Sequence, residues 1–200
     1  MRGAAAKINL AVSDLPRFKG APEGAQHLRG KIVIAPDLEY LERASDAAKY
    51  GEFSERPCLE IDIPTLAEPD RAPQGRHILS IHAQYAPHAL KSGWTDRRRK
   101  EFGERVIAIL SEYAPNLKRA VLHKQVLVPT DLETMFGMTE GSADHGEHLL
   151  DQLFFMRPVG GWSQYRLPVP GLYLCGAGAH PGGGVTGLPG KLAAQAALRG

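Results

Sequence analysis

Segments in which apolar and polar residues alternate are predicted to form β-strands with one buried face. The alternation is clear over residues 58–63 (CLEIDI) and 77–85 (HILSIHAQY). Residues 6–12 (AKINLAV) and 120–128 are predicted to form two more strands, and the apolar residues 172–175 a short one. The chain therefore contains four or five predicted strands.

Helical spacing of apolar residues, together with end signals, predicts the helices. The clearest helix begins after Thr95, a good N-cap, and ends at Tyr113, with one apolar stripe along its length. In a second helix, over residues 129–136, we expect Thr130 to be the cap and Glu133 to complete a capping box. Two further helices are predicted over residues 36–50 and 191–198. The fold class is therefore mixed α/β (α+β).

The composition fits a folded chain that does not rely on electrostatic capture of nucleic acid. The chain has 200 residues, 43% of them hydrophobic and 23% charged, which suits one domain, or a domain plus a lobe, with a real core. Lys plus Arg is 24 and Asp plus Glu is 22, a balance too even for a nucleic-acid partner. The basic run 97–100 is interpreted as a solvated helix face balanced by nearby glutamates.

Targeting signals and cysteines indicate a reducing compartment. No stretch approaches the roughly 18 apolar residues of a membrane span, and the first twelve residues make a poor signal peptide. Cys58 and Cys175 are far apart in sequence, which argues against a disulfide scaffold. A cytoplasmic location is therefore expected.

The segment 171–190 (GLYLCGAGAHPGGGVTGLPG) is unusual because it contains eight glycines in twenty positions. A predicted strand precedes it and a predicted helix follows it, which favours an ordered turn over a linker. A P-loop is excluded, because its first glycine would fall on Val185 and Leu192 stands where Ser or Thr is required. Residues 182–187 match G-x-G-x-x-G, but they follow the strand too late for a first βαβ unit.

A third interpretation is a turn that brings backbone close to a flat cofactor. Glycines at 182, 183, 184 and 187 let a ligand approach the main chain without a side-chain clash. The N–H groups and positive dipole end of the following helix would stabilise developing negative charge, as on a reduced flavin.

The residues GLYLCGAGAHPGGGVTGLPGKLAA (171–194) resemble the C-terminal FAD motif of phytoene-dehydrogenase-like flavoproteins. That family includes carotenoid desaturases, retinol saturases and pyridine nucleotide-disulfide oxidoreductase domain-containing proteins. The segment 145–165 (HGEHLLDQLFFMRPVGGWSQY) resembles the family's sequence just before the motif. The resemblance implies a substrate-domain portion with a mixed sheet and helices over residues 1–140. It also implies a C-terminal FAD-binding segment over 141–200, the returning strand, glycine turn and helix of a two-part FAD-binding domain whose ADP-binding βαβ half is absent.

The resemblance also implies which residues contact FAD. Gly176, Ala177 and Gly178 would lie beside the cofactor at the strand end, and His180 and Gly187 would be contacts within the motif. The isoalloxazine edge would lie over the residues Gly183, Gly184, Val185 and Thr186. Ala179 stands where relatives often have Thr, which puts one side-chain contact in doubt.

His145 and His148 are the candidate catalytic residues, as proton donor or acceptor near the flavin. Two alternatives stay open, an ordinary polar loop and a metal site on a shared helix face, although no further Cys or His lies nearby in sequence and no metal is expected. His82 and His88 are interpreted as structural, Cys175 as a small apolar residue on a buried strand, and residues 152–156 as core.

The leading hypothesis is the C-terminal part of an FAD-dependent oxidoreductase that dehydrogenates an apolar, unsaturated small molecule. The alternative is a substrate-lobe or oligomerising binding module without flavin, and a third hypothesis is a metal-dependent hydrolase using His145 and His148. The expected partners are the apolar substrate and either a second copy or a missing N-terminal half. Peripheral contact with a membrane stays open.

Overall fold

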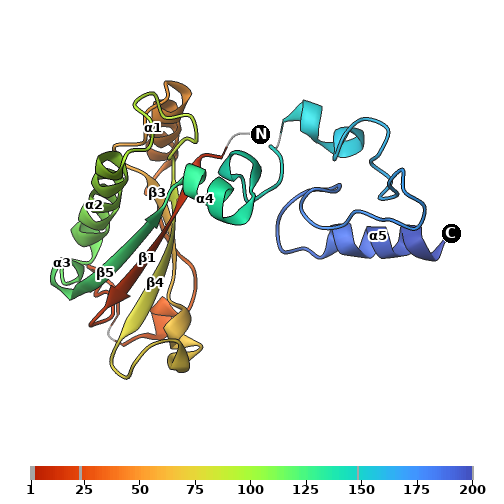
Figure 1. Cartoon of the computed structure of the whole chain (residues 1–200). Helices are drawn as coiled ribbons and strands as arrows, with labels where there is room; N and C mark the ends of the chain where they lie inside the picture. The colour runs from red at the N-terminus through yellow and green to blue at the C-terminus, as the bar shows by residue number, and fades with distance from the viewer. Residues whose placement is uncertain (1–2, 23, 148, 200) are drawn as a thin grey trace.

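The computed structural model describes residues 3–22, 24–147 and 149–199, in which one antiparallel sheet of five strands dominates (Figure 1). In the order β2-β3-β4-β1-β5, its strands are Ile32–Ile34, Cys58–Asp62, His77–Gln84, Ala5–Val12 and Val121–Leu127. The helices α1 to α5 are Leu38–Lys49, Asp96–Tyr113, Leu117–Ala120, Pro129–Phe136 and Leu188–Leu198. The predicted mixed α/β class is confirmed, whereas the three-residue strand β2 was not predicted.

The sheet separates its side chains onto one apolar and one polar face, because successive residues of a strand point in opposite directions. In β1 the residues Ile8 and Leu10 are fully buried, as are Leu79 and Ile81 opposite them in β4. The intervening residues of both strands are only partly buried and mostly polar. The period-two pattern of the sequence therefore identified the core face of the sheet.

Helix α2 covers the apolar face of the sheet. It begins after Thr95, whose side chain accepts a hydrogen bond from the Arg98 N–H at 3.3 Å, and it ends at Tyr113, as predicted. Its buried side chains include Phe102 and Val106, which belong to the same core cluster as β1 and β4. Gly103 lets the helix approach β5, because a Cβ at this position would lie 2.6 Å from Val126 Cγ2.

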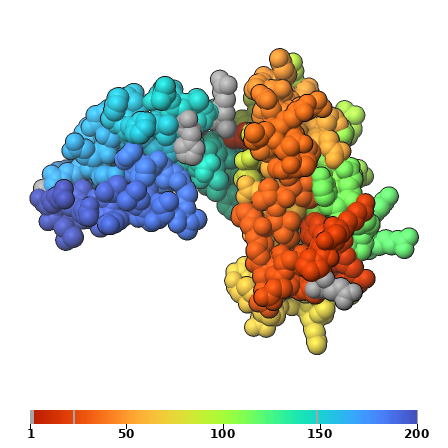
Figure 2. Space-filling view, turned by 180° about the vertical axis from the view of Figure 1, so that it is seen from behind, coloured from red at the N-terminus to blue at the C-terminus, as the bar shows by residue number. Residues whose placement is uncertain are grey.

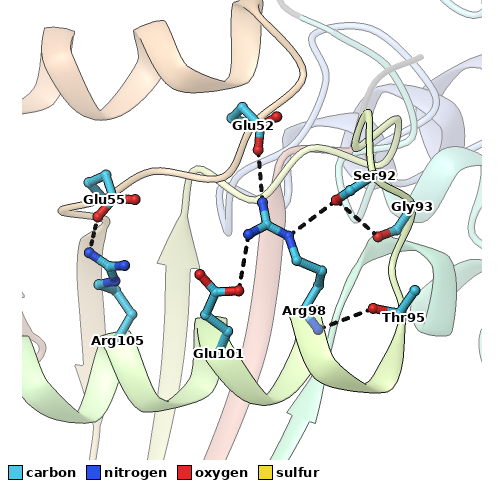
Figure 3. A network of polar contacts seen from close by, with 8 residues as sticks. All are labelled: Glu52, Glu55, Ser92, Gly93, Thr95, Arg98, Glu101 and Arg105. Atoms are coloured by element: carbon cyan, nitrogen blue, oxygen red, sulfur yellow. Dashed lines mark hydrogen bonds and ion pairs between the residues drawn. The ribbon is translucent and has the colours of Figure 1, made fainter.

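Four basic residues of α2, Arg98, Arg99, Lys100 and Arg105, are paired with carboxylates, as the helix-face interpretation expects. Arg98 contacts Glu52 at 2.8 Å and Glu101 at 3.0 Å, and Arg105 pairs with Glu55 (Figure 3). The Arg98 guanidinium also lies 4.3 Å from the centre of the Phe53 ring. These contacts join α2 to the loop before β3.

Helix α4 has the predicted bounds but a different cap. The Asp131 side chain accepts a hydrogen bond from the Val128 N–H at 2.9 Å, so Val128 is the N-cap residue and the prediction of Thr130 was wrong. Glu133 does not complete a capping box. It accepts hydrogen bonds from the Glu140 N–H at 2.8 Å and contacts His88 Nε2 at 2.8 Å, which joins α4 to neighbouring loops.

The residues after Gly141 form a second lobe beside the sheet, joined to it through the region of α4 (Figures 1 and 2). The predicted strand 172–175 is not formed there, and a single bridge between Arg166 and Tyr173 is present instead. Cys175 is exposed, so its assignment to a buried strand was wrong. Phe154 and Phe155 are also exposed, at 60% and 72%, and residues 152–156 are therefore not core in this chain.

Helix α5 is the regular element of this second lobe. It begins at Leu188, three residues before the predicted start at 191, and ends at Leu198 as predicted. Pro189 lies in its first turn, where a missing N–H costs no hydrogen bond. The helix therefore starts directly at the last glycine of the G-x-G-x-x-G match, Gly187.

Candidate functional site

A cavity of about 710 Å³ lies between the polar face of the sheet and the first residues after α4. Lys7 of β1 is paired with His82 of β4, and Ala5 with Gln84, so three polar side chains lie together on this face. Asp144 and Glu147, from the residues that follow α4, also line the cavity. The remaining lining is mostly apolar or backbone: Gly3, Ala4, Ala5, Ala6, Tyr85, Leu132, Met138, Gly141, Ser142, Ala143, Gly146 and Leu149.

Lys7 is a partly buried cation at the floor of this cavity. Its Nζ donates a hydrogen bond to Ser80 Oγ. Burial lowers the pKa of Lys7, the charge of Asp62 opposes that change, and the nearby Lys31 adds to it.

His82 is held as a neutral imidazole. Its Nε2 lies 3.1 Å from Gln84 Nε2, and because an amide nitrogen only donates, the His82 Nε2 accepts and the ring proton is on Nδ1. Burial is the largest effect and lowers the pKa of His82, Glu60 and Asp144 partly counter it, and Lys7 reinforces it. A neutral His82 therefore offers one N–H donor.

The predicted catalytic residue His145 is not on a helix. His145 is exposed and lies in a turn with a φ of +50°. Because His145 is not in a helix, the hypothesis that residues 145 and 148 share a helix face is wrong. His148 lies outside the described residues. His145 itself does not line the cavity, although its neighbours Asp144 and Gly146 do.

The turn around His145 lies directly against the glycine segment. A Cβ on Gly178 would lie 3.9 Å from the His145 Cβ, and a Cβ on Gly183 would lie 3.0 Å from Asp144 Oδ1. Asp144 therefore has the cavity on one side and the glycine segment on the other. The structure thus brings together three of the predicted site residues: His145, Gly178 and Gly183.

Arg157 holds this arrangement in place. It is 2% exposed and donates hydrogen bonds to three backbone carbonyls, those of Gln152 at 2.9 Å, Glu147 at 2.9 Å and Ala177 at 2.7 Å. Gly146 leaves room for the guanidinium, because a Cβ there would lie 2.5 Å from Arg157 Nη2. One side chain therefore joins the wall of the cavity to the start of the glycine segment.

The glycine segment has a backbone suited to close approach by a flat ligand. Gly176, Gly182, Gly184 and Gly187 all have φ values between +68° and +106°, in the region that favours glycine. Val185 at the tip of the turn is fully exposed. The Thr186 Oγ1 accepts a hydrogen bond from the Leu188 N–H at 3.2 Å, which leaves its hydroxyl proton free to donate.

His180 is partly buried at the middle of the same segment. The Tyr165 hydroxyl donates to the His180 carbonyl at 3.1 Å, and the imidazole lies 6.1 Å from the Phe154 ring. Its Nδ1 is buried without a hydrogen-bond partner among the residues described. An unpaired polar atom beside a glycine turn fits a segment that completes its contacts with a bound group.

These observations test whether the segment fits the flavin that its sequence implies. The left-handed glycines, the unpaired His180 Nδ1 and the N-terminus of α5 fit the polar edge of an isoalloxazine ring. Within the described residues, no group of three or more His, Cys, Asp or Glu side chains is placed to hold a metal ion. Over the same residues, no helix is long and apolar enough to cross a membrane.

The sequence analysis missed Lys7, Gln84 and the role of Arg157, and it interpreted His82 as structural. The alternation in β4 places His82 and Gln84 on the face opposite Leu79 and Ile81, so the pattern contained part of the signal. The pairing of β1 with β4, which adds Lys7, depends on register and was not readable from the sequence.

In sequence, the chain is similar to part of several known oxidoreductases. No protein-family model matches it. It is 43% identical over 201 residues to pyridine nucleotide-disulfide oxidoreductase domain-containing protein 2 of Rattus norvegicus. It is 32% identical over 190 residues to one of the subunits of limonene dehydrogenase from Castellaniella defragrans, and 29% over 184 residues to a lycopene-forming phytoene desaturase of a Paracoccus species.

These alignments cover 96%, 89% and 90% of the chain but 35%, 34% and 34% of the relatives. The chain thus spans about a third of the length of the curated relatives it matches. The matches confirm the resemblance stated from the residues: the chain is related in sequence to the phytoene-dehydrogenase-like oxidoreductases and is consistent with a C-terminal fragment of that family.

Proposed function

We propose that the chain supplies the flavin-edge and substrate-binding parts of an FAD-dependent oxidoreductase that takes hydride from an apolar small molecule. The observation that carries the proposal is the contact between the glycine segment and the cavity wall at Gly183 and Asp144. It puts the segment that resembles an FAD motif next to a cavity of ligand size. The relatives named as dehydrogenase and desaturases support this reaction class.

The chain's own residues would bind and orient the cofactor. FAD, when bound, supplies the hydride acceptor. The backbone of Gly183, Gly184 and Val185 would approach the isoalloxazine edge, and Thr186 and His180 would donate or accept hydrogen bonds there. The first turn of α5 has N–H groups without partners inside the helix, and its positive dipole end favours negative charge on the ring. His145 remains a proposed proton donor or acceptor, since its turn contacts Gly178.

A second candidate function, a binding module without flavin, is favoured by the apolar surface of the second lobe. Several large apolar side chains are exposed there: Leu149, Leu150, Phe154, Phe155, Val159, Val169, Leu172 and Val185. Such a surface is typical of a chain that packs against more polypeptide. In this case the lobe would assemble with a second copy or another chain and would not respond to flavin.

A flavin titration separates the two functions. Because the proposed contacts are with the isoalloxazine ring, we expect the chain to quench the fluorescence of riboflavin and of FAD, and we expect ADP not to compete. Gly183→Val should weaken riboflavin binding at least about tenfold, since its side chain would enter the contact with Asp144. Gly30→Ala is the control, because a Cβ there meets nothing within 4 Å.

Two results would overturn the flavin proposal: no quenching by the wild-type chain, or equal quenching by Gly183→Val and Gly30→Ala. Absence of quenching combined with a defined oligomer in light scattering would favour the binding module.

A further inference from the structure

The cavity between the sheet and residues 141–149 is apolar over most of its lining and polar at one place. Lys7 and His82 are paired across β1 and β4, and Gln84 follows two residues along the same face. Around them the lining is formed by small or apolar residues, among them Ala5, Leu132 and others named above. The volume of about 710 Å³ is within the range of small-molecule sites, roughly 300–1,000 Å³.

Lys7 and His82, the polar part of the lining, have N–H groups that form no hydrogen bond within the described residues. Lys7 uses one of its three N–H groups on Ser80 Oγ. Among the described residues, no hydrogen bond reaches His82 Nδ1, which carries the ring proton. The two side chains line the same cavity from adjacent strands, and each keeps at least one N–H group without a hydrogen bond among the described residues.

The charges around Lys7 and His82 determine whether the cavity favours a charged or a neutral ligand group. Lys7 is the lysine among the described residues that line the cavity, and Asp144, whose charge acts on His82, lines it as well. Asp62 and Lys31 also act on Lys7, and Glu60 acts on His82, from the same face of the sheet. A carboxylate or phosphate ligand beside His82 would meet the negative charge of Asp144, which acts on His82, whereas a neutral oxygen would accept from the donors without that repulsion.

We propose that this cavity binds an apolar molecule that has a single neutral oxygen, a hydroxyl or a carbonyl, and that Lys7 and His82 hold that oxygen. This inference rests on the proposed function, because it takes the bound molecule to be the substrate, with its polar end on the sheet and its apolar body against apolar lining residues such as Leu132, Met138 and Leu149. Lys7 and His82 are binding residues that determine specificity for the oxygen.

The test compares three terpenoid probes of similar size: geraniol with a hydroxyl, citral with a carbonyl, and the hydrocarbon myrcene. Binding to the full chain is measured by calorimetry or ligand-observed NMR. We expect geraniol and citral to bind about tenfold more tightly than myrcene, as expected for one or two added hydrogen bonds. Lys7→Met and His82→Leu should each reduce this preference to about threefold or less, while myrcene binding is unchanged or slightly improved.

Asn9→Leu is the matched control, because Asn9 lies on the same sheet face and bonds Gln125 at 2.9 Å but does not line the cavity. It should retain the tenfold preference. Circular dichroism verifies that each variant is folded. Because Lys7 and His82 lie on different strands, one variant still tests the proposal if the other does not fold. Equal affinity of the wild type for geraniol and myrcene would overturn the proposal, as would a full preference in both Lys7→Met and His82→Leu.

The riboflavin titration distinguishes this failure from failure of the proposed function. Lys7→Met should bind riboflavin as the wild type does, since Lys7 is not part of the glycine segment. An oxygen preference without any riboflavin response would leave the cavity assignment standing and remove the flavin role. The opposite result would remove only the oxygen-binding role of Lys7 and His82.

Discussion

Arg157 Nη1 donates a hydrogen bond of 2.7 Å to the carbonyl oxygen of Ala177, across 20 residues of a lobe with little regular structure. Two further carbonyls are bonded by the same guanidinium, so three loop segments meet at one buried cation. Among the described residues of this lobe, α5 is the one long helix, and the loops lack the backbone hydrogen bonds that a sheet would supply. Arg157 instead satisfies loop carbonyls with its side chain.

Replacing Arg157 by Met should therefore loosen the second lobe. Three carbonyls lose their donor together, and we expect a loss of about 2–4 kcal/mol in the stability of this lobe. Limited proteolysis should show faster cleavage between residues 142 and 187, while the sheet remains resistant. Arg166→Met, at an exposed position of the same lobe, is the control. Equal protection of the two variants would contradict the role assigned to Arg157.

Gly141 should tolerate no side chain. Its φ is +69° and a Cβ would lie 2.3 Å from the Pro129 carbonyl oxygen, so Gly141→Ala must move the start of α4 or the chain after it. We expect a loss of about 3 kcal/mol or more in urea unfolding. Gly137 has a nearly equal φ of +66° with nothing within 4 Å, and Gly137→Ala should lose only about 1 kcal/mol. Similar losses for the two variants would show that the close contact has no effect.

The contact between α2 and β5 can be tested by a double-mutant cycle. Gly103→Ala improves helix propensity by about 1 kcal/mol but forces a Cβ to 2.6 Å from Val126 Cγ2, and we expect a net loss of about 1–2 kcal/mol. In a chain that already has Val126→Ala, the same substitution should be neutral or stabilising. Additive losses in thermal unfolding would show that the two residues are not coupled.

His82 should make stability depend on pH. Because burial lowers its pKa in the folded state below the usual 6.5, the unfolded chain binds a proton first as pH falls. The contribution of His82 to the free energy of unfolding is therefore complete above about pH 6.5 and is lost as pH falls through the folded-state pKa. The wild type should therefore lose more of its Tm between pH 7.5 and 5.5 than His82→Gln does. Parallel Tm curves for the two proteins would contradict this assignment.

The sheet was largely predictable because its strands alternate and its helix α2 has a cap and one apolar stripe. Thr95 and Tyr113 bound that helix both in the sequence pattern and in the structure. The cap of α4 was missed because Asp131 can bond backward to Val128, and the local sequence offered Thr130 as an equally good candidate.

The candidate site was less predictable because tertiary contacts create it. The glycine segment was evident from its composition, and α5 follows it as expected. The cavity requires the register of β1 with β4 and the passage of Asp144 beside Gly183, which no local pattern encodes. Residues 172–175 have the composition of a strand, but in the structure they form a single bridge, between Tyr173 and Arg166. Composition alone did not predict this, because a strand also requires a partner strand to pair with.

The strand order has a consequence for how the chain is made. β1 precedes the other four strands of its sheet in the chain, yet it lies between β4 and β5, and its Asn9 bonds Gln125, 116 residues later. The backbone edge of β1 that pairs with β5 therefore waits for most of the sheet lobe to leave the ribosome, and a nascent chain that stops before residue 121 has that edge of β1 unpaired. Stable folding of this lobe is expected only after β5 has emerged.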